Sequence, residues 1–170
     1  MTGSRLPGSP VVWIVVAQLL GTSLWFSANS AADDLRVLWG LSDADLGDLT
    51  IAVQAGFIVG TLLFAVTAFA DRYPASRIFA CSAVAGAATN AGFALFADSV
   101  GEGWGWRFAT GLTLAGIYPL GMKMVVGWSP ESSGVALGWL VGMLTLGTAL
   151  PHLVRGLGTG LQWQAVVLTS

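Results

Sequence analysis

Long apolar stretches alternate with short polar segments along this 170-residue chain. A helix needs about 20 mostly apolar residues to cross the roughly 30 Å of hydrocarbon in a bilayer. Five stretches reach that length, and they cover residues 11–31, 49–70, 78–97, 108–128 and 135–154. The pattern predicts an all-α membrane protein in which each stretch is one transmembrane helix.

The segments between these stretches carry charges, glycines or prolines that end a helix. Ser42 followed by Asp45 predicts the start of the second helix, because a hydroxyl and a carboxylate can both bind free amides there. A sixth apolar stretch begins at Trp163 and covers only residues 163–170. We interpret it as the start of a sixth span in a truncated sequence; a short surface segment is the alternative. The expected organisation is therefore a cytoplasmic segment, 1–10, followed by one transmembrane bundle, 11–170.

Composition supports a membrane protein over a soluble one. Hydrophobic residues make up 55% of the chain and charged residues only 9%, against about 25% charged in an average soluble domain. Glycine occurs 23 times and Trp eight times, which is typical of helices that pack closely in lipid with aromatic rings at the bilayer surface.

Charge and cysteine content exclude several functions. The formal net charge is -2, without a basic run, so we expect no nucleic-acid partner. Cys81, the only cysteine, cannot form an internal disulfide. The first apolar stretch is too long for a cleaved signal peptide and is interpreted as a retained helix.

The distribution of Lys and Arg favours a cytoplasmic N-terminus. With that orientation the inner side holds Arg5, Arg72, Arg77 and Lys123, and the outer side holds Arg36, Arg107 and Arg155. The excess of basic residues on the inner side becomes larger if Arg107 lies within the membrane and is not counted on the outer side.

Glycines recur every four residues in two predicted spans, at Gly56 and Gly60 in the second and at Gly134, Gly138 and Gly142 in the fifth. This spacing places bare backbone on one face of a helix, where another helix can approach closely. Gly147 and Pro151 come later in the fifth span. They either serve ordinary packing or allow the helix to bend during a functional cycle.

Polar residues of the first span fall on one helix face: Gln18, Thr22, Trp25 and Asn29. Exposing hydrogen-bonding side chains to lipid costs free energy, so this face should meet other helices or water. Contacts between helices and a substrate-lining surface are both open interpretations. Gln54 and Asn90 are isolated polar residues in the second and third spans.

Arg107 opens the fourth span, and Tyr118 follows on the same predicted face. An arginine in hydrocarbon is costly unless it is paired or hydrated, so it indicates function by default. The alternative is an interfacial arginine between Trp104 and Trp106. Lys123 is interpreted as an anchor at the inner surface, and His152 as an interfacial polar residue, with proton sensing as the less favoured alternative.

Residues 70–77 resemble the loop signature of the major facilitator superfamily, with Asp71, Arg72 and Arg77 matching in kind and place. Thr67 and Pro74 replace the two glycines of that signature. Residues 107–111 resemble the arginine-to-glycine pattern of the family's fourth helix. The glycine-rich fifth span and Trp163 resemble its fifth and sixth helices.

That resemblance implies the N-terminal helical bundle of a 12-helix alternating-access transporter in the inner membrane, with a missing C-terminal half as partner. The cargo would be a small molecule or an ion, and proton coupling is one option. Asp71 would face a helix N-terminus of the other half, while Arg72 and Arg77 would pair across an inner gate. Candidate substrate-binding residues are Gln18, Trp25, Asn29, Gln54, Arg107 and Tyr118.

We expect no enzyme activity, catalytic residue, cofactor or metal site. An intramembrane serine protease is disfavoured because Ser132 and Ser133 lie at a helix end without the required glycine. A small membrane assembly or binding protein, and half of another repeat-built transporter family, remain as alternatives.

Overall fold

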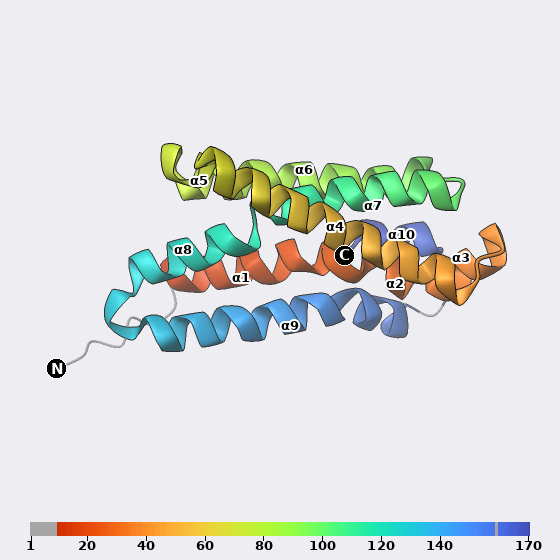
Figure 1. Ribbon diagram of the computed structural model, residues 1–170. Coiled ribbons are helices and arrows are strands. Elements are labelled where there is room, and N and C mark those ends of the chain that lie inside the picture. Colours follow the sequence, from red (N-terminus) through yellow and green to blue (C-terminus); the bar gives the residue numbers. More distant parts are fainter. Residues whose placement is uncertain (1–9, 159) are drawn as a thin grey trace.

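Five long helical stretches lie side by side in the computed structural model, which describes residues 10–158 and 160–170 (Figure 1). In the described residues, the stretches that are long and apolar enough to cross a membrane are Pro10–Ser30, Asp43–Thr67, Ala75–Phe96, Val100–Trp128 and Pro130–Leu157. They correspond in order to the five predicted spans, which confirms the all-α membrane fold. The expected segment 1–10 lies almost wholly outside the described residues.

The first predicted span, 11–31, corresponds to one helical stretch, Pro10–Ser30, that contains a 3-10 turn. α1 (Pro10–Ser23) leads into a 3-10 turn, η1 (Leu24–Phe26), and then into α2 (Ser27–Ser30). The hydroxyl of Ser23 donates to the carbonyl of Leu20, and the hydroxyl of Ser30 to the carbonyl of Ser27, both at 2.6 Å. Such local bonds compete with the regular helical ladder. The break leaves main-chain carbonyls available to a partner.

α3 (Ala32–Trp39) follows α2, and Gly40 ends it at a φ of 66°. α4 (Asp43–Thr67) then starts with the predicted cap: the Asp45 amide donates to the Ser42 side chain, while the Ser42 amide donates to the Asp45 carboxylate. The helix begins at the cap, six residues before the apolar pattern does. A short α5 (Phe69–Arg72) connects α4 to α6 (Ala75–Phe96).

The fourth predicted span, 108–128, lies within one helical stretch, Val100–Trp128, and this stretch also contains a break. α7 (Val100–Leu114) ends at a turn over residues 115–117, and α8 (Tyr118–Trp128) continues from there. Pro119, in the first turn of α8, has no amide hydrogen to donate to a preceding carbonyl. The break therefore has a local cause in the sequence.

The remaining elements are η2 (Pro130–Ser132), α9 (Ser133–Leu157) and α10 (Trp163–Leu168). α9 is one helix although it contains Pro151. α10 confirms that the apolar residues after Gln162 are helical.

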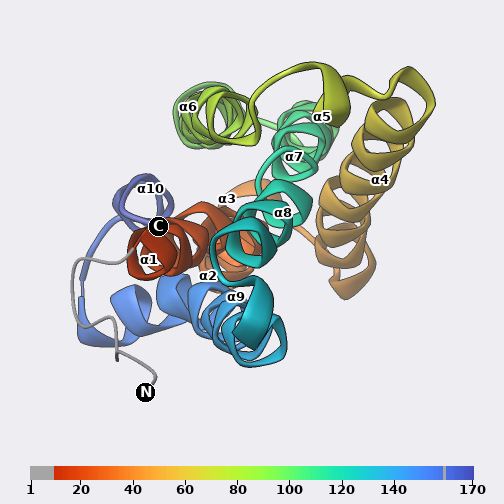
Figure 2. The ribbon, with the colours of Figure 1, turned by 90° about the vertical axis from the view of Figure 1, so that its left-hand side faces the viewer.

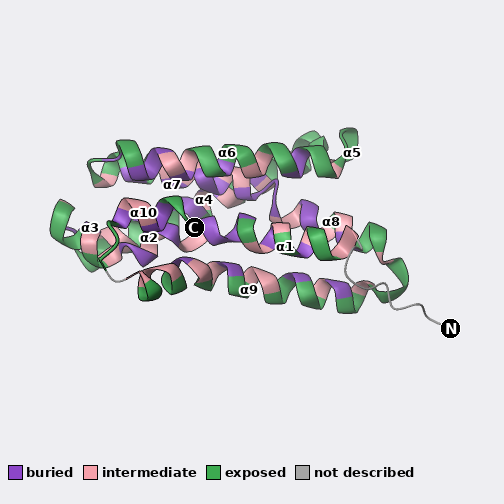
Figure 3. Ribbon diagram, turned by 180° about the vertical axis from the view of Figure 1, so that it is seen from behind, coloured by how far each residue is buried: buried purple, intermediate pink, exposed green. Residues whose placement is uncertain are grey.

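Seen from the end, the helices form two layers (Figure 2). α6, α7 and α4 make one layer, whereas α10, α1, α8 and α9 make the other. The turn at 115–117 carries the fourth span from the first layer to the second. Figure 3 shows buried residues where helices face one another and exposed residues along α6 and α9.

Glycines bring the helices of each layer into close contact. A Cβ on Gly56 would collide with the carbonyl oxygen of Phe108, and a Cβ on Gly111 with that of Val53. α4 and α7 therefore touch backbone to backbone. In the second layer a Cβ on Gly147 would collide with the carbonyl oxygen of Leu19, so α9 packs directly on α1.

Candidate functional site

Arg107 on α7 is buried inside the bundle, with none of its side chain exposed. One guanidinium nitrogen, Nη2, donates to the carbonyls of Leu24, at 3.0 Å, and Trp25. These acceptors belong to the 3-10 turn in the first span. The charge joins the two layers through the break in the first span.

Ser27 and Asn90 complete the surroundings of the guanidinium. Arg107 Nη1 donates to Ser27 Oγ at 3.0 Å and to Asn90 Oδ1 at 3.3 Å. The Ser27 hydroxyl donates to Asn90 Oδ1 at 2.6 Å, and Asn90 Nδ2 donates to the Val167 carbonyl at 2.8 Å. We call Arg107, Ser27 and Asn90 the arginine cluster; it links α2, α6, α7 and α10.

A group of aromatic side chains covers the arginine cluster toward the end of the bundle that carries α3. The Phe93 ring centroid lies 5.8 Å from Arg107 Cζ, a distance that permits a cation–π interaction. Trp39 and Trp163 contact this ring edge-on, with centroids 6.1 and 5.8 Å away. Trp163, predicted as the entry to a sixth helix, thereby fixes α10 against α6 and α3.

The polar residues of the first span have different surroundings. Gln18 is fully buried, and neither amide atom has a hydrogen-bond partner in the described part of the chain. Asn29 Nδ2 donates to Thr50 Oγ1 of α4 at 2.9 Å, which is a contact between helices. Trp25 is half-buried and packs on Phe57 with ring centroids 4.9 Å apart.

Gln54 and Tyr118 do not join the arginine cluster. Gln54 is exposed on α4, and Tyr118 is half-buried at the start of α8. Tyr118 packs with the buried group that contains Val15 and Leu140. The turn at 115–117 separates Tyr118 from the helix that carries Arg107.

At the opposite end from α3, Lys123 connects α8 to the turn between the second and third spans. Its Nζ donates to Asp71 Oδ1 and to the Ala70 carbonyl, both at 2.7 Å. The hydrogen bond and charge of Lys123 lower the pKa of the Asp71 carboxyl. Lys123, expected as a surface anchor, is thus an ion-pair partner of Asp71. Arg72 and Arg77 are exposed.

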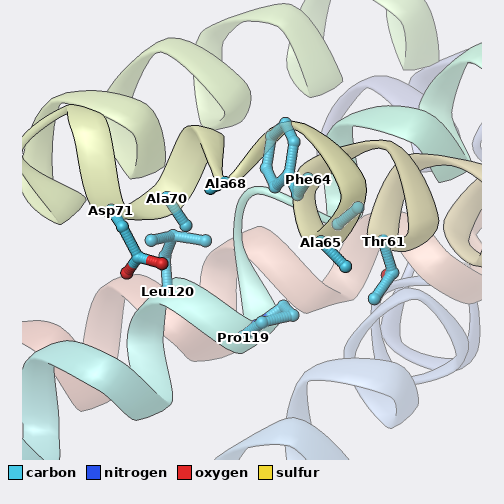
Figure 4. Close-up of a pocket in the computed structure, with 9 residues that line it drawn as sticks. Thr61, Phe64, Ala65, Ala68, Ala70, Asp71, Pro119 and Leu120 are labelled. Atoms are coloured by element: carbon cyan, nitrogen blue, oxygen red, sulfur yellow. The ribbon is translucent and has the colours of Figure 1, made fainter.

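A cavity of about 220 Å³ lies between α4 and the start of α8, next to Asp71 (Figure 4). Its wall is mostly apolar. The lining residues are Thr61, Phe64, Ala65, Ala68, Ala70, Asp71, Ala115, Pro119 and Leu120.

The glycines of α9 separate into two groups. Gly134, Gly138 and Gly142 have open space where a side chain would be, so they do not contact another described helix. Gly147 and Pro151 are buried, and Gly147 packs on α1. His152 is exposed.

Sequence reasoning missed several residues of these sites. Ser27 belongs to the arginine cluster, and Phe93 and Trp39 cover it. Asn90 was interpreted as an isolated polar residue although it holds three partners. Gly116 and Pro119 carried the signal for the break in the fourth span, since proline interrupts the helical ladder.

A model of the Major Facilitator Superfamily matches residues 12–170. No curated protein and no solved structure gave a significant match.

Proposed function

This chain belongs to the major facilitator superfamily, a family of transporters, and we propose that it forms the N-terminal bundle of a carrier that moves a small solute by alternating access. The family consists of transporters and not enzymes, and its members move small molecules across membranes. The chain is accordingly a multi-pass membrane protein.

The observation that carries the proposal is the pair of broken spans. In secondary transporters, interrupted helices near the middle of the membrane often line the substrate pathway. Here the first and fourth spans are both interrupted, and Arg107 contacts the break in the first span. We propose that Trp25, Gln54 and Tyr118 contribute to the pathway, with Gln18 and Asn29 nearby, and that Arg107 supports its wall from inside the bundle.

We propose that the end carrying Asp71 is cytoplasmic and that the membrane is the inner membrane. Arg72, Arg77 and Lys123 gather at that end. At the other end Arg155 pairs with Asp34 at 2.7 Å, and Arg36 pairs with Asp33 and Asp43. Since Arg107 is buried in the bundle, the positive-inside rule favours this orientation.

A second helical bundle is the proposed partner, and the gate would lie between the two. The open glycine face of α9 offers a surface that a helix can approach closely. The exposed Arg72 and Arg77 would pair with groups of that bundle when the inner gate closes. Asp71 would contribute to the same gate. Proton coupling stays one option.

Uptake measurements on the whole gene product test this proposal. Cells lacking the gene are compared with cells that express it, using a pool of labelled small solutes. A solute whose uptake requires the gene identifies the cargo class, whereas no such solute in either direction across the membrane would contradict the transporter proposal.

The Asp71→Asn variant then tests the gate. We expect slower uptake with normal membrane insertion, because the substitution removes the negative charge that the closed gate uses. Asp98→Asn, at an exposed turn on the other side, is the matched control and should transport normally. Wild-type rates for Asp71→Asn would refute the role of Asp71 at the gate.

A further inference from the structure

The cavity between α4 and the start of α8 has the size of a small-molecule site. Its volume is about 220 Å³, and in another protein an apolar cavity of about 150 Å³ is large enough to bind benzene. Ala65, Ala68 and Asp71 in its wall are exposed, so the cavity opens at the protein surface. A molecule with one aromatic ring therefore fits the volume and can reach it.

The end of α4 shapes one side of the cavity. α4 stops at Ala68, which has a φ of 49°, and the chain turns there into α5. A left-handed conformation is unfavourable for a residue with a Cβ, so the surrounding packing must hold this turn in place. The turn brings Ala70 and Asp71 into the same wall as Phe64 and Ala65 (Figure 4).

The ring of Phe64 is a fixed part of the wall. It stacks on Phe69 with ring centroids 5.4 Å apart and an angle of 22° between the ring planes. A Cβ on Gly116 would lie 3.3 Å from the Phe64 ring, so the ring also packs against the turn at 115–117. Because the ring is held before a ligand binds, less conformational entropy is lost on binding. A second aromatic ring can pack favourably against it.

The two polar side chains in the wall lie at opposite ends of the cavity, and both can accept a hydrogen bond from a ligand (Figure 4). The Thr61 hydroxyl donates its hydrogen to the Phe57 carbonyl at 2.8 Å, so its oxygen is left as an acceptor. The Asp71 carboxylate accepts and does not donate. The cavity therefore favours a ligand that carries a hydrogen-bond donor.

Asp71 is the stronger of the two acceptors. Lys123 Nζ donates to its Oδ1 at 2.7 Å and lowers the pKa of the carboxyl, so the group is ionised at neutral pH. An ionised acceptor forms a stronger hydrogen bond than a neutral one, and the carboxylate has further acceptor positions beside the one that Lys123 uses. Since the ammonium group of Lys123 balances the negative charge, a cationic ligand gains little, whereas an anionic ligand is repelled by the acceptor itself.

We propose that this cavity binds a small uncharged aromatic molecule that carries an O–H or N–H group. The ring packs among Phe64, Pro119 and Leu120, and the donor points to the Asp71 carboxylate. The proposal goes beyond the proposed function, because a molecule can bind here whether or not it is transported.

Protection from thiol alkylation tests the site, with p-cresol as the probe and the whole gene product in native membranes. All cysteines, Cys81 included, are replaced by Ser, and Ala65→Cys places a reporter in the exposed part of the wall. At about ten times the concentration that gives half-protection, p-cresol should slow alkylation by N-ethylmaleimide about tenfold. Absence of protection would overturn the proposal. A reporter that does not react even without p-cresol would also overturn it, because lipid or another part of the protein would then fill the cavity.

The neighbouring position supplies the matched control. Val66 is 86% exposed and is not part of the cavity wall. Alkylation of Val66→Cys should therefore be indifferent to p-cresol. Equal slowing at both reporters would mean a general effect of p-cresol on the membrane and would overturn the site.

Two further probes test the chemistry of the ligand. In p-xylene a methyl group of similar size replaces the O–H of p-cresol, so equal protection should need roughly three to ten times the free concentration. The anion 4-methylbenzoate should give no protection over the range in which p-cresol protects. Protection by either probe as strong as that by p-cresol would overturn the proposed ligand class. Because the readout is binding and not uptake, its failure leaves the transport measurement to decide the proposed function separately.

Discussion

At the scale of single residues, Arg107 shows how a charge can be stable inside an apolar bundle. Its partners are two carbonyls released by a helix break, one hydroxyl and one amide. Ionised donors form stronger hydrogen bonds than neutral ones. The cost of burying the guanidinium is thus offset by acceptors that a regular helix would not offer.

Replacing Arg107 with Met should destabilise the bundle by about 3 kcal/mol or more, because it leaves the Leu24 and Trp25 carbonyls buried without a donor. Thermal unfolding in detergent measures the loss. Arg36→Met is the control and should cost at most about 1 kcal/mol, since its ion pairs are exposed. Equal losses in the two variants would contradict the structural role of the arginine cluster.

The ion pair between Lys123 and Asp71 should be insensitive to pH from about 5 to 8. The pKa of Asp71 is lowered from its ordinary 3.8 by the hydrogen bond and charge of Lys123, so the pair is intact above that value and is lost only as the pH falls through the lowered pKa. The difference in thermal unfolding between the wild type and Lys123→Met, measured in detergent across this range, checks the expectation. A difference that changes within this range would show that another group controls the pair.

At the scale of helices, the close contact between α4 and α7 depends on Gly111, whereas Gly138 on α9 has free space around it. Gly111→Ala should cost about 1–3 kcal/mol through overpacking against the Val53 carbonyl. Gly138→Ala should leave thermal unfolding of the bundle unchanged or raise its midpoint, because Ala favours the helix by up to about 1 kcal/mol. Equal effects of the two substitutions would contradict the packing described here.

The existence and order of the spans followed from apolar length, and the cap at Ser42 followed from side-chain chemistry. The breaks in the first and fourth spans could not be predicted in this way, because the length of an apolar stretch does not reveal whether its backbone hydrogen bonds are continuous. Ser27 and Pro119 were local hints, yet serine and proline are both tolerated within membrane helices.

The contents of the candidate site were harder to predict than the fold. Arg107 meets Ser27 across 80 positions of the chain, and Lys123 meets Asp71 across 52. Periodicity can place a residue on a face of its own helix, but it cannot identify the helix opposite. For that reason Asn90 was interpreted as isolated, although it binds Ser27, Arg107 and Val167.

At the scale of the whole molecule, the basic residues are distributed unequally between the two ends. In intact cells a membrane-impermeant maleimide should label Asp98→Cys but label Ser76→Cys only after permeabilisation, both in the Cys81→Ser background. The reason is that Arg72, Arg77 and Lys123 favour retention of their end in the cytoplasm. Labelling in the reverse pattern would contradict the proposed orientation.

The arginine cluster also has a consequence for biosynthesis. The ribosome delivers the first and third spans to the membrane before Arg107 emerges, so Ser27 and Asn90 are already present when the positive charge needs acceptors. Val167, which binds Asn90, is made after Arg107. In a permuted gene that encoded the fourth span first, the guanidinium of Arg107 would enter the membrane before its hydrogen-bond acceptors had been made.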